Sequence, residues 1–214
     1  MAKKNPEWFF CLKTAEETKI IPDDELRSAK AVMSKDEYDQ EFFCSFEAAI
    51  RGAYFSEEIR LMKEQMRFCK VPYESVLPVY TGWDLGIDDA TAIWFCQKYG
   101  RELRLIDYEE HNGEKIEFYV TLLHKKGYNY ETHYFPHDMQ VREMGSGVSR
   151  LETFLLLAGN QNYRIIPAQN PADRIQAIRT LFPQMWIHSE KCSYAVEALS
   201  QYRKDWNEEK KTFR

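Results

Sequence analysis

The pattern of apolar and polar positions divides the chain into a helical N-terminal part and a longer part in which strands and helices alternate. Three helices are predicted early, one beginning near Pro22, one running from Ser34 to about Phe43, and one from Ser56 to about Cys69. Acidic residues follow Pro22, and a capping-box spacing follows Ser34, which are both typical helix starts. We therefore expect residues 1–75 to form an arm or linker and not a self-sufficient domain.

Beyond residue 76 the pattern predicts strands at 78–85, 91–98, 102–109, 130–136 and 164–167, with a short edge segment at 186–188. Helices are predicted at 114–126, 149–158 and 170–181, and from 192 to about 210. The first three strands have hairpin spacing, and a turn is expected around 111–113. Gly159 ends one helix, and Asn170-Pro171 starts the next.

Three consecutive strands followed by alternating helices and strands predict an α/β fold. The expected architecture is a ribonuclease H-like mixed sheet flanked by helices, with an N-terminal helical linker arm. Residues 1–75 would form the arm, and residues 76–214 the sheet domain.

Composition and charge limit the class of protein. The 214 residues are 44% hydrophobic and include 13 Phe, 13 Tyr and 5 Trp, enough for a sizeable core. The net charge of −5 argues against a surface that binds nucleic acid all over, but it allows a local basic groove. Five scattered cysteines without a CxxC pair indicate reduced intracellular thiols. Because no apolar run or signal peptide is present, we expect no membrane segment and a cytoplasmic location.

Two strands end in acidic residues. Asp84 ends the strand that includes Val79, and Asp138 follows the strand at 130–136. Two strand-borne carboxylates are a common way of holding catalytic divalent cations. The structural alternative for Asp84 is a turn aspartate before Gly86, although a carboxylate leaving a buried strand is costly unless it meets a cation. Asp89 would bind a second metal through water or cap the turn.

Other polar residues have both a functional and a structural interpretation. His137 is a metal ligand or proton shuttle, or a solvated side chain. Asp107 approaches the site or is an ordinary strand-end residue.

The basic residues Lys125 and Lys126, and the glycine-rich loop between Arg142 and Arg150, are candidate DNA contacts. A helix N-terminus beside that loop offers free N–H groups to phosphate, although capping loops have the same composition. The absence of GxxxxGK[ST] excludes a P-loop ATPase of that kind within this sequence.

These motifs resemble a known family. Gly82-Trp83-Asp84-Leu85-Gly86 with residues 89–93 is similar to the first motif of the nuclease domain of tailed-phage terminase large subunits, and residues 134–138 to the second. Residues 167–203 resemble the stretch that follows in that family, and residues 21–55 resemble its link between motor ATPase and nuclease. The resemblance covers almost the whole chain.

The resemblance implies an endonuclease that cuts concatemeric double-stranded DNA during genome packaging with two Mg²⁺ or Mn²⁺ ions. Asp84 would bridge both ions, and Asp138 would hold one. The implied partners are double-stranded DNA, the terminase ATPase domain, the small terminase subunit and the portal.

The sequence departs from the family in two ways. The ATPase half is not present, and the third acidic residue expected after the final helix is not reached before Arg214. Asp205, Glu197 or Glu208 would substitute for it only by accident of helix geometry, so we expect weak or absent metal binding at one of the two sites and reduced cleavage. The alternatives are a non-cutting module that binds DNA or the portal, and a junction resolvase or transposase of the same fold.

Overall fold

The computed structural model divides the chain into two compact units, Met1–Ser56 with Arg203–Arg214, and Glu57–Tyr202. It describes residues 13–33, 38, 41–43, 53–86, 90–142, 147–159, 161–203, 206–207 and 212–213. In the first unit lie α1 (Ala15–Thr18), α2 (Asp23–Val32) and the hairpin of β8 (Trp206–Asn207) with β9 (Thr212–Phe213). The predicted division at residue 75 stays a prediction.

A mixed sheet forms the centre of the second unit. Its strands are β1 (Phe68–Cys69), β2 (Val79–Asp84), β3 (Ala90–Tyr99), β4 (Glu102–Asn112), β5 (Tyr130–Pro136), β6 (Tyr163–Ile166) and β7 (Met185–His188). The order within the described residues is β1-β7-β4-β3-β2-β5-β6. β3 is antiparallel to β2 and β4, whereas the other neighbours are parallel. The predicted ribonuclease H-like fold class is therefore confirmed.

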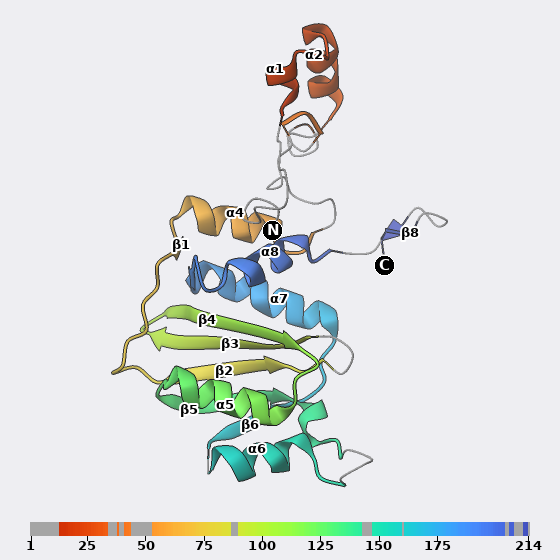
Figure 1. Cartoon of the computed structure of the whole chain (residues 1–214). Helices are drawn as coiled ribbons and strands as arrows, with labels where there is room; N and C mark the ends of the chain where they lie inside the picture. The colour runs from red at the N-terminus through yellow and green to blue at the C-terminus, as the bar shows by residue number, and fades with distance from the viewer. Residues whose placement is uncertain are drawn as a thin grey trace, which may run out of the picture. The chain divides into compact units, whose positions relative to one another are not determined.

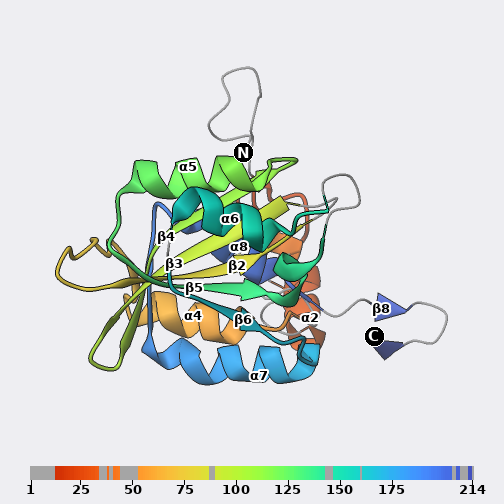
Figure 2. The same ribbon diagram turned by 90° about the horizontal axis from the view of Figure 1, so that it is seen from below.

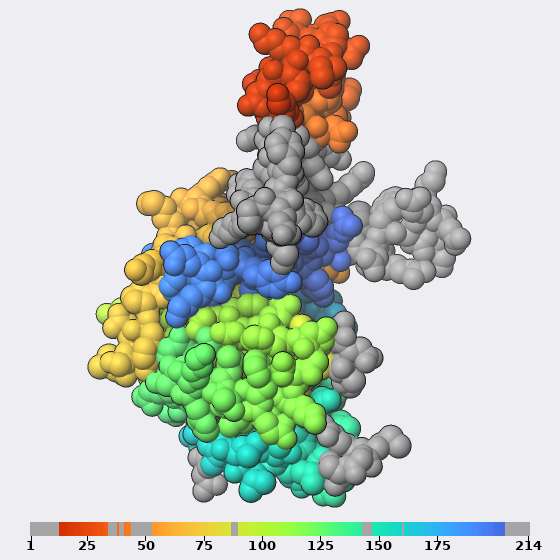
Figure 3. Space-filling view, viewed as in Figure 1, coloured from red at the N-terminus to blue at the C-terminus, as the bar shows by residue number. Residues whose placement is uncertain are grey.

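Helices cover both faces of this sheet (Figures 1 and 2). On one face lie α5 (Ile116–Lys126) and α6 (Arg150–Ala158), and on the other α4 (Ser56–Glu64), α7 (Pro171–Leu181) and α8 (Ser193–Gln201). The short 3-10 turns η2 (His137–Gln140) and η3 (Phe182–Gln184) follow β5 and α7. In the space-filling view the layers follow one another from α4 and α8 through β4 and α5 to α6 (Figure 3).

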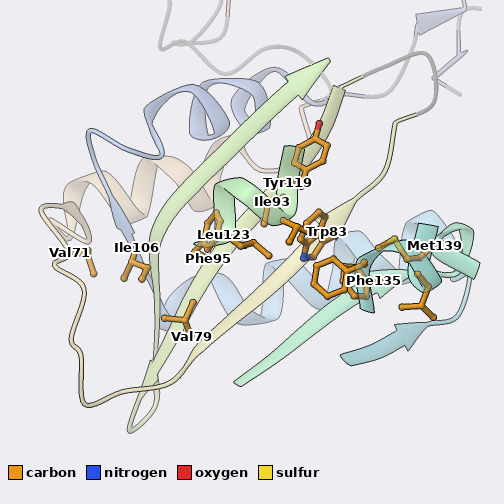
Figure 4. Close-up of a cluster of buried hydrophobic side chains, with 13 residues drawn as sticks. Val71, Val79, Trp83, Ile93, Phe95, Ile106, Tyr119, Leu123, Phe135 and Met139 are labelled. Carbon is orange, nitrogen blue, oxygen red and sulfur yellow. The ribbon is translucent and has the colours of Figure 1, made fainter. Parts of the chain in front are cut away.

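The main core lies between the sheet and the α5–α6 layer (Figure 4). The Trp83 ring lies 5.1 Å from Phe135 and 5.9 Å from Phe154, measured between ring centroids. Phe135 and Phe154 are fully buried, so apolar area from β2, β5 and α6 is removed from water together. This packing fixes β2 against β5.

Local signals place the helices as expected. Ser149 and Glu152 form the capping box that begins α6, and Asn170 Oδ1 accepts a hydrogen bond from the backbone N–H of Ala172 at 2.9 Å. Gly127 ends α5 in the left-handed region, where glycine has no Cβ penalty. The predicted helix at 34–43 lies largely outside the described residues.

Three predicted elements differ in the structure. The helix from Ser56 ends at Glu64, and Phe68–Cys69 instead pairs with β7. β7 is therefore an interior strand and not the predicted edge. The final helix ends at Gln201, well before the predicted end near residue 210. The charged positions after it offer little apolar surface that a helix would bury.

Candidate metal centre at the ends of two strands

Two neighbouring strands bring acidic residues to the same edge of the sheet. β2 and β5 run parallel, with Gly82 opposite Tyr134. Asp84 is the last residue of β2, and Asp138 lies in η2 directly after β5. Because adjacent parallel strands end at one edge, the two carboxylates paired in the sequence analysis come to a common place.

The alternation of side chains along β2 determines where Asp84 points. Trp83 is 7% exposed and belongs to the core, whereas Asp84 lies on the opposite face and is exposed. On that face Asp84 is in register with Ala92 of β3. The small side chain of Ala92 leaves room beside the carboxylate, which therefore borders open space.

Asp84, His137 and Asp138 line one cavity of about 650 Å³. Its floor is formed by strand residues that include Trp94, Tyr108 and Tyr134. Arg174 of α7 and the small and apolar residues Ala195, Ala198 and Leu199 of α8 form the walls. The cavity thus combines two carboxylates with one cationic side chain and several aromatic rings.

The two carboxylates differ in their immediate neighbours. Oδ1 of Asp138 lies 3.0 Å from Nε2 of the adjacent His137, and both side chains are about half exposed. Asp84 forms no ion pair and no side-chain hydrogen bond within the part of the chain that the structure describes. Its negative charge is therefore not neutralised by any of these residues.

Tyr108 is a neutral hydrogen-bond donor in the cavity floor. Its hydroxyl donates to Oε2 of Glu110, two residues further along β4. Burial raises the pKa of Tyr108 above the ordinary range, helped by the bond to Glu110 and by the negative charge of Asp84. The phenol consequently keeps its proton at neutral pH.

The donor set fits a hard divalent cation. Mg²⁺ prefers oxygen ligands, and it commonly keeps several waters while one or two carboxylates bind it. Asp84 and Asp138 supply such oxygens, and the cavity has room for water. No cluster of three or more His, Cys, Asp or Glu suited to a metal exists among the described residues. Asp89, predicted to assist a second metal, lies outside them.

A buried hydrogen-bond chain links the two strands beneath the site. Trp83 Nε1 donates to Thr81 Oγ1 at 2.8 Å, and Thr81 Oγ1 lies 2.7 Å from Nδ1 of His133. Because the indole only donates, the hydroxyl can accept from it and donate its own hydrogen to a neutral imidazole. Burial lowers the pKa of His133 to about 4, which keeps it neutral. These hydrogen bonds therefore join β2 to β5 through buried side chains.

The predicted basic contacts lie away from this cavity. Lys125 and Lys126 end α5, on the opposite face of the sheet (Figure 2). Nζ of Lys126 lies 2.6 Å from Oδ2 of buried Asp107 and 2.6 Å from Oε1 of Glu109. Lys126 is thus engaged with these two carboxylates, and its role as a DNA contact stays a prediction. Asp107 does not line the cavity.

The other two predicted arginines flank the start of α6. Arg142 is exposed, and its guanidinium lies 3.7 Å from Glu152. Arg150 lines a second cavity near the start of α5. Neither lines the cavity that holds Asp84.

Arg174 and the aromatic floor of the cavity were not predicted from the sequence as parts of the site. Arg174 lies in the first turns of a helix whose start was predicted correctly from Asn170 and Pro171. The local pattern does not encode which face of the sheet the helix covers, however. The alternation of side chains along β4 could have indicated Tyr108, because it places Tyr108 and Glu110 on the same face of the strand.

Comparisons with known proteins place this fold. No family model and no curated protein matches the sequence. Among solved structures, the large terminase of a thermophilic bacteriophage in complex with ATP-gamma-S matches with a TM-score of 0.52 at 14% identity, over 94% of this chain and 50% of that one. Another crystal of the same terminase matches with a TM-score of 0.51 at 14% identity, over 90% of this chain and 47% of that one. The large terminase nuclease of the thermophilic phage G20c matches with a TM-score of 0.48 at 15% identity, over 76% of this chain and 88% of that one.

The architecture thus defines an α/β protein of the ribonuclease H-like class. More particularly, it is the fold of a region of phage large terminases, and the predicted resemblance is confirmed at the level of the fold. The chain spans about half the length of the first of these terminases. None of the helices in the described part of the chain is long and apolar enough to cross a bilayer.

Proposed function

We propose that this chain is the nuclease domain of a viral DNA-packaging terminase and cleaves concatemeric double-stranded DNA with divalent cations. One observation carries the proposal: Asp84, at the end of β2, and Asp138, just after the neighbouring parallel strand β5, line a single cavity. The lack of a counter-charge for Asp84 among the described residues supports it. The terminase fold supplies the context in which this chemistry is useful.

Asp84 and Asp138 are the residues that would hold Mg²⁺ or Mn²⁺, two ions in the intact site. When bound, such ions activate water and stabilise charge on the attacking and leaving oxygens of a phosphodiester. The carboxylates themselves fix the place of the reaction, because each extends from the end of a strand held by the core.

His137 is suited to moving a proton. Its Nε2 lies beside Oδ1 of Asp138, so an N–H at Nε2 can donate to that carboxylate and leave Nδ1 as an acceptor. Hydrolysis forms a bond between water oxygen and phosphorus and breaks a phosphorus–oxygen bond of the strand. Nδ1 of His137 can accept the proton from the attacking water, and solvent water can protonate the leaving oxygen on the other side of the phosphorus.

The proposal includes the partners of the complete packaging assembly. Double-stranded DNA is the substrate, held mainly through its backbone and therefore with little sequence choice. The terminase ATPase domain, the small terminase subunit and the portal are the protein partners, and the host cytoplasm is the site of action.

A second candidate is a non-cutting module that binds DNA or the portal. It is favoured by one observation, since no third acidic ligand joins Asp84 and Asp138 among the described residues. Both candidates predict DNA binding, but only the first predicts metal-dependent cleavage.

Nicking of supercoiled plasmid in Mn²⁺ tests the proposed function. We expect the wild-type chain to nick and Asp84→Asn to lose about 100-fold or more in rate, because one cation ligand is removed. Glu131→Gln, at the opposite end of β5, is the matched control and should keep wild-type activity. Equal activity in wild type and Asp84→Asn would refute the assignment. No nicking by a wild-type chain that binds DNA would select the second candidate.

A further inference from the structure

Arg174 is positioned as a further functional group of the cavity, besides Asp84, Asp138 and His137. It lies in α7, one turn after the cap formed by Asn170, and it lines the cavity that contains Asp84 and Asp138. Ile175, the next residue, is 8% exposed and anchors this part of the helix. The guanidinium is therefore carried by a fixed helix start, whereas its own side chain is exposed.

The guanidinium of Arg174 has no partner within the described residues. It forms no ion pair and no side-chain hydrogen bond there. Several other arginines of the sheet unit have partners. Arg60, Arg104 and Arg179 form ion pairs with Glu57 and Glu64, with Glu102, and with Glu58, respectively. Arg67 donates hydrogen bonds to the carbonyls of Phe182 and Met185. On the same helix, Arg179 is thus paired and Arg174 is not.

This arrangement is informative because acids line the same cavity. A solvated arginine needs no explanation, but here the cation and two carboxylates share one cavity without forming an ion pair. A ligand that contacts all three groups must offer anionic oxygens to the guanidinium. It must also bind the metal ions that the carboxylates hold. A phosphodiester meets both conditions, and a planar guanidinium can bind two of its oxygens at once.

We propose that Arg174 binds non-bridging phosphate oxygens of the DNA strand that enters this cavity, at the scissile phosphate or its neighbour. The inference rests on the proposed function, because it assigns the same cavity to DNA. The carboxylates hold the cation side of the phosphate, and Arg174 holds it from the α7 wall. Arg174 is a substrate-binding residue in this assignment, and it takes no part in holding the metal.

The test separates DNA binding from metal binding. We would measure the affinity for a short duplex by fluorescence anisotropy in Ca²⁺ at several salt concentrations. Mn²⁺ affinity would be measured by calorimetry without DNA. The variants are Arg174→Gln, Arg174→Lys and, as control, Arg101→Gln, which lies in the exposed turn between β3 and β4 at the opposite end of the strands.

We expect Arg174→Gln to weaken duplex binding about tenfold, the loss of one charged hydrogen-bonding group. The slope of log affinity against log salt should fall by about 1, the value for one phosphate contact. Arg174→Lys should recover part of the affinity, because it restores the charge without the fork. Mn²⁺ affinity in Arg174→Gln should not fall, and Arg101→Gln should match wild type in every measurement.

Unchanged affinity and salt slope in a folded Arg174→Gln would overturn the inference. A loss of Mn²⁺ affinity in that variant would also overturn it, since Arg174 would then act through the metal site. Failure of the proposed function gives a different result. In that case Asp84→Asn would leave Mn²⁺ binding and nicking unchanged, while the effect of Arg174→Gln on duplex binding could still be observed.

Discussion

Single residues along β2 serve two opposite purposes. Thr81 and Trp83 point into the core, and Asp84 points into the cavity. Because strand side chains alternate strictly, a shift of one residue in the register would bury the carboxylate and expose the indole. The apolar core that selects the register therefore also fixes where Asp84 points.

Buried His133 should make the fold sensitive to mild acid. Its pKa is lowered by burial to about 4, below the ordinary value near 6.5, so the unfolded state binds more protons between these pH values. Stability is thus complete above about pH 6.5. It should fall by about 3 kcal/mol as the pH drops to about 4.

Urea unfolding of wild type and His133→Gln at pH 7 and pH 4.5 checks this. The variant should be less stable at pH 7 but lose less on acidification. His137→Gln, a change at an exposed histidine, is the control and should follow wild type. Identical losses in wild type and His133→Gln would show that another group causes the acid sensitivity.

At the scale of elements, the pairing of β2 with β5 matters most for the site. Each strand delivers one acid, and the hydrogen-bond chain from Trp83 through Thr81 to His133 joins the two strands inside the core. The separation of the carboxylates therefore depends on buried groups that never touch a ligand.

Removal of the Thr81 hydroxyl should be costly. Thr81→Val keeps the shape but leaves the Trp83 N–H and the acceptor nitrogen of His133 without a partner in a fully buried place. We expect a loss of about 2–3 kcal/mol in the free energy of unfolding, measured in urea. Thr132→Val, in half-buried surroundings on β5, should change it by no more than about 0.5 kcal/mol. A Thr81→Val protein as stable as wild type would show that the hydroxyl is dispensable.

The elements that the sequence predicts well are those with strong local signals. The strand at 130–136 and the helices beginning at Ser149 and Asn170 agree closely with β5, α6 and α7. The errors arise where distant partners decide. Phe68–Cys69 becomes a strand only because β7 is available to pair with it, and that pairing moves β7 from the edge to the interior.

At the scale of the whole molecule, the sequence predicted Asp84, His137 and Asp138 as members of the candidate site and omitted Arg174. Asp84 and Asp138 were recognisable because each ends an apolar strand, and parallel pairing brings them together. Arg174 reaches the cavity from α7, and tertiary packing decides which face of the sheet this helix covers. The metal roles of Asp84, Asp138 and Asp89 stay predictions.

Metal binding should stabilise the folded molecule as a whole. A ligand that binds only the folded state adds about 2.7 kcal/mol at 100 times its dissociation constant, so Mn²⁺ should raise the melting temperature. Asp84→Asn should melt near the wild-type temperature without metal, since Asp84 is exposed and has no partner among the described residues.

Thermal melts with and without Mn²⁺, followed by addition of EDTA, measure this effect. The shift should disappear with EDTA and be absent in Asp84→Asn, whereas Glu131→Gln should show the full shift. A Mn²⁺-dependent shift of equal size in Asp84→Asn would place the binding site elsewhere.

The parallel pairing of β2 with β5 has one more consequence. Parallel neighbours cannot be joined by a tight turn, and here the connection runs through β3, β4 and α5. The two carboxylates are consequently brought together only when the whole topology has formed, because no local segment contains both. A peptide containing either strand alone would carry a lone acid, and only a chain that has completed the crossover can present both.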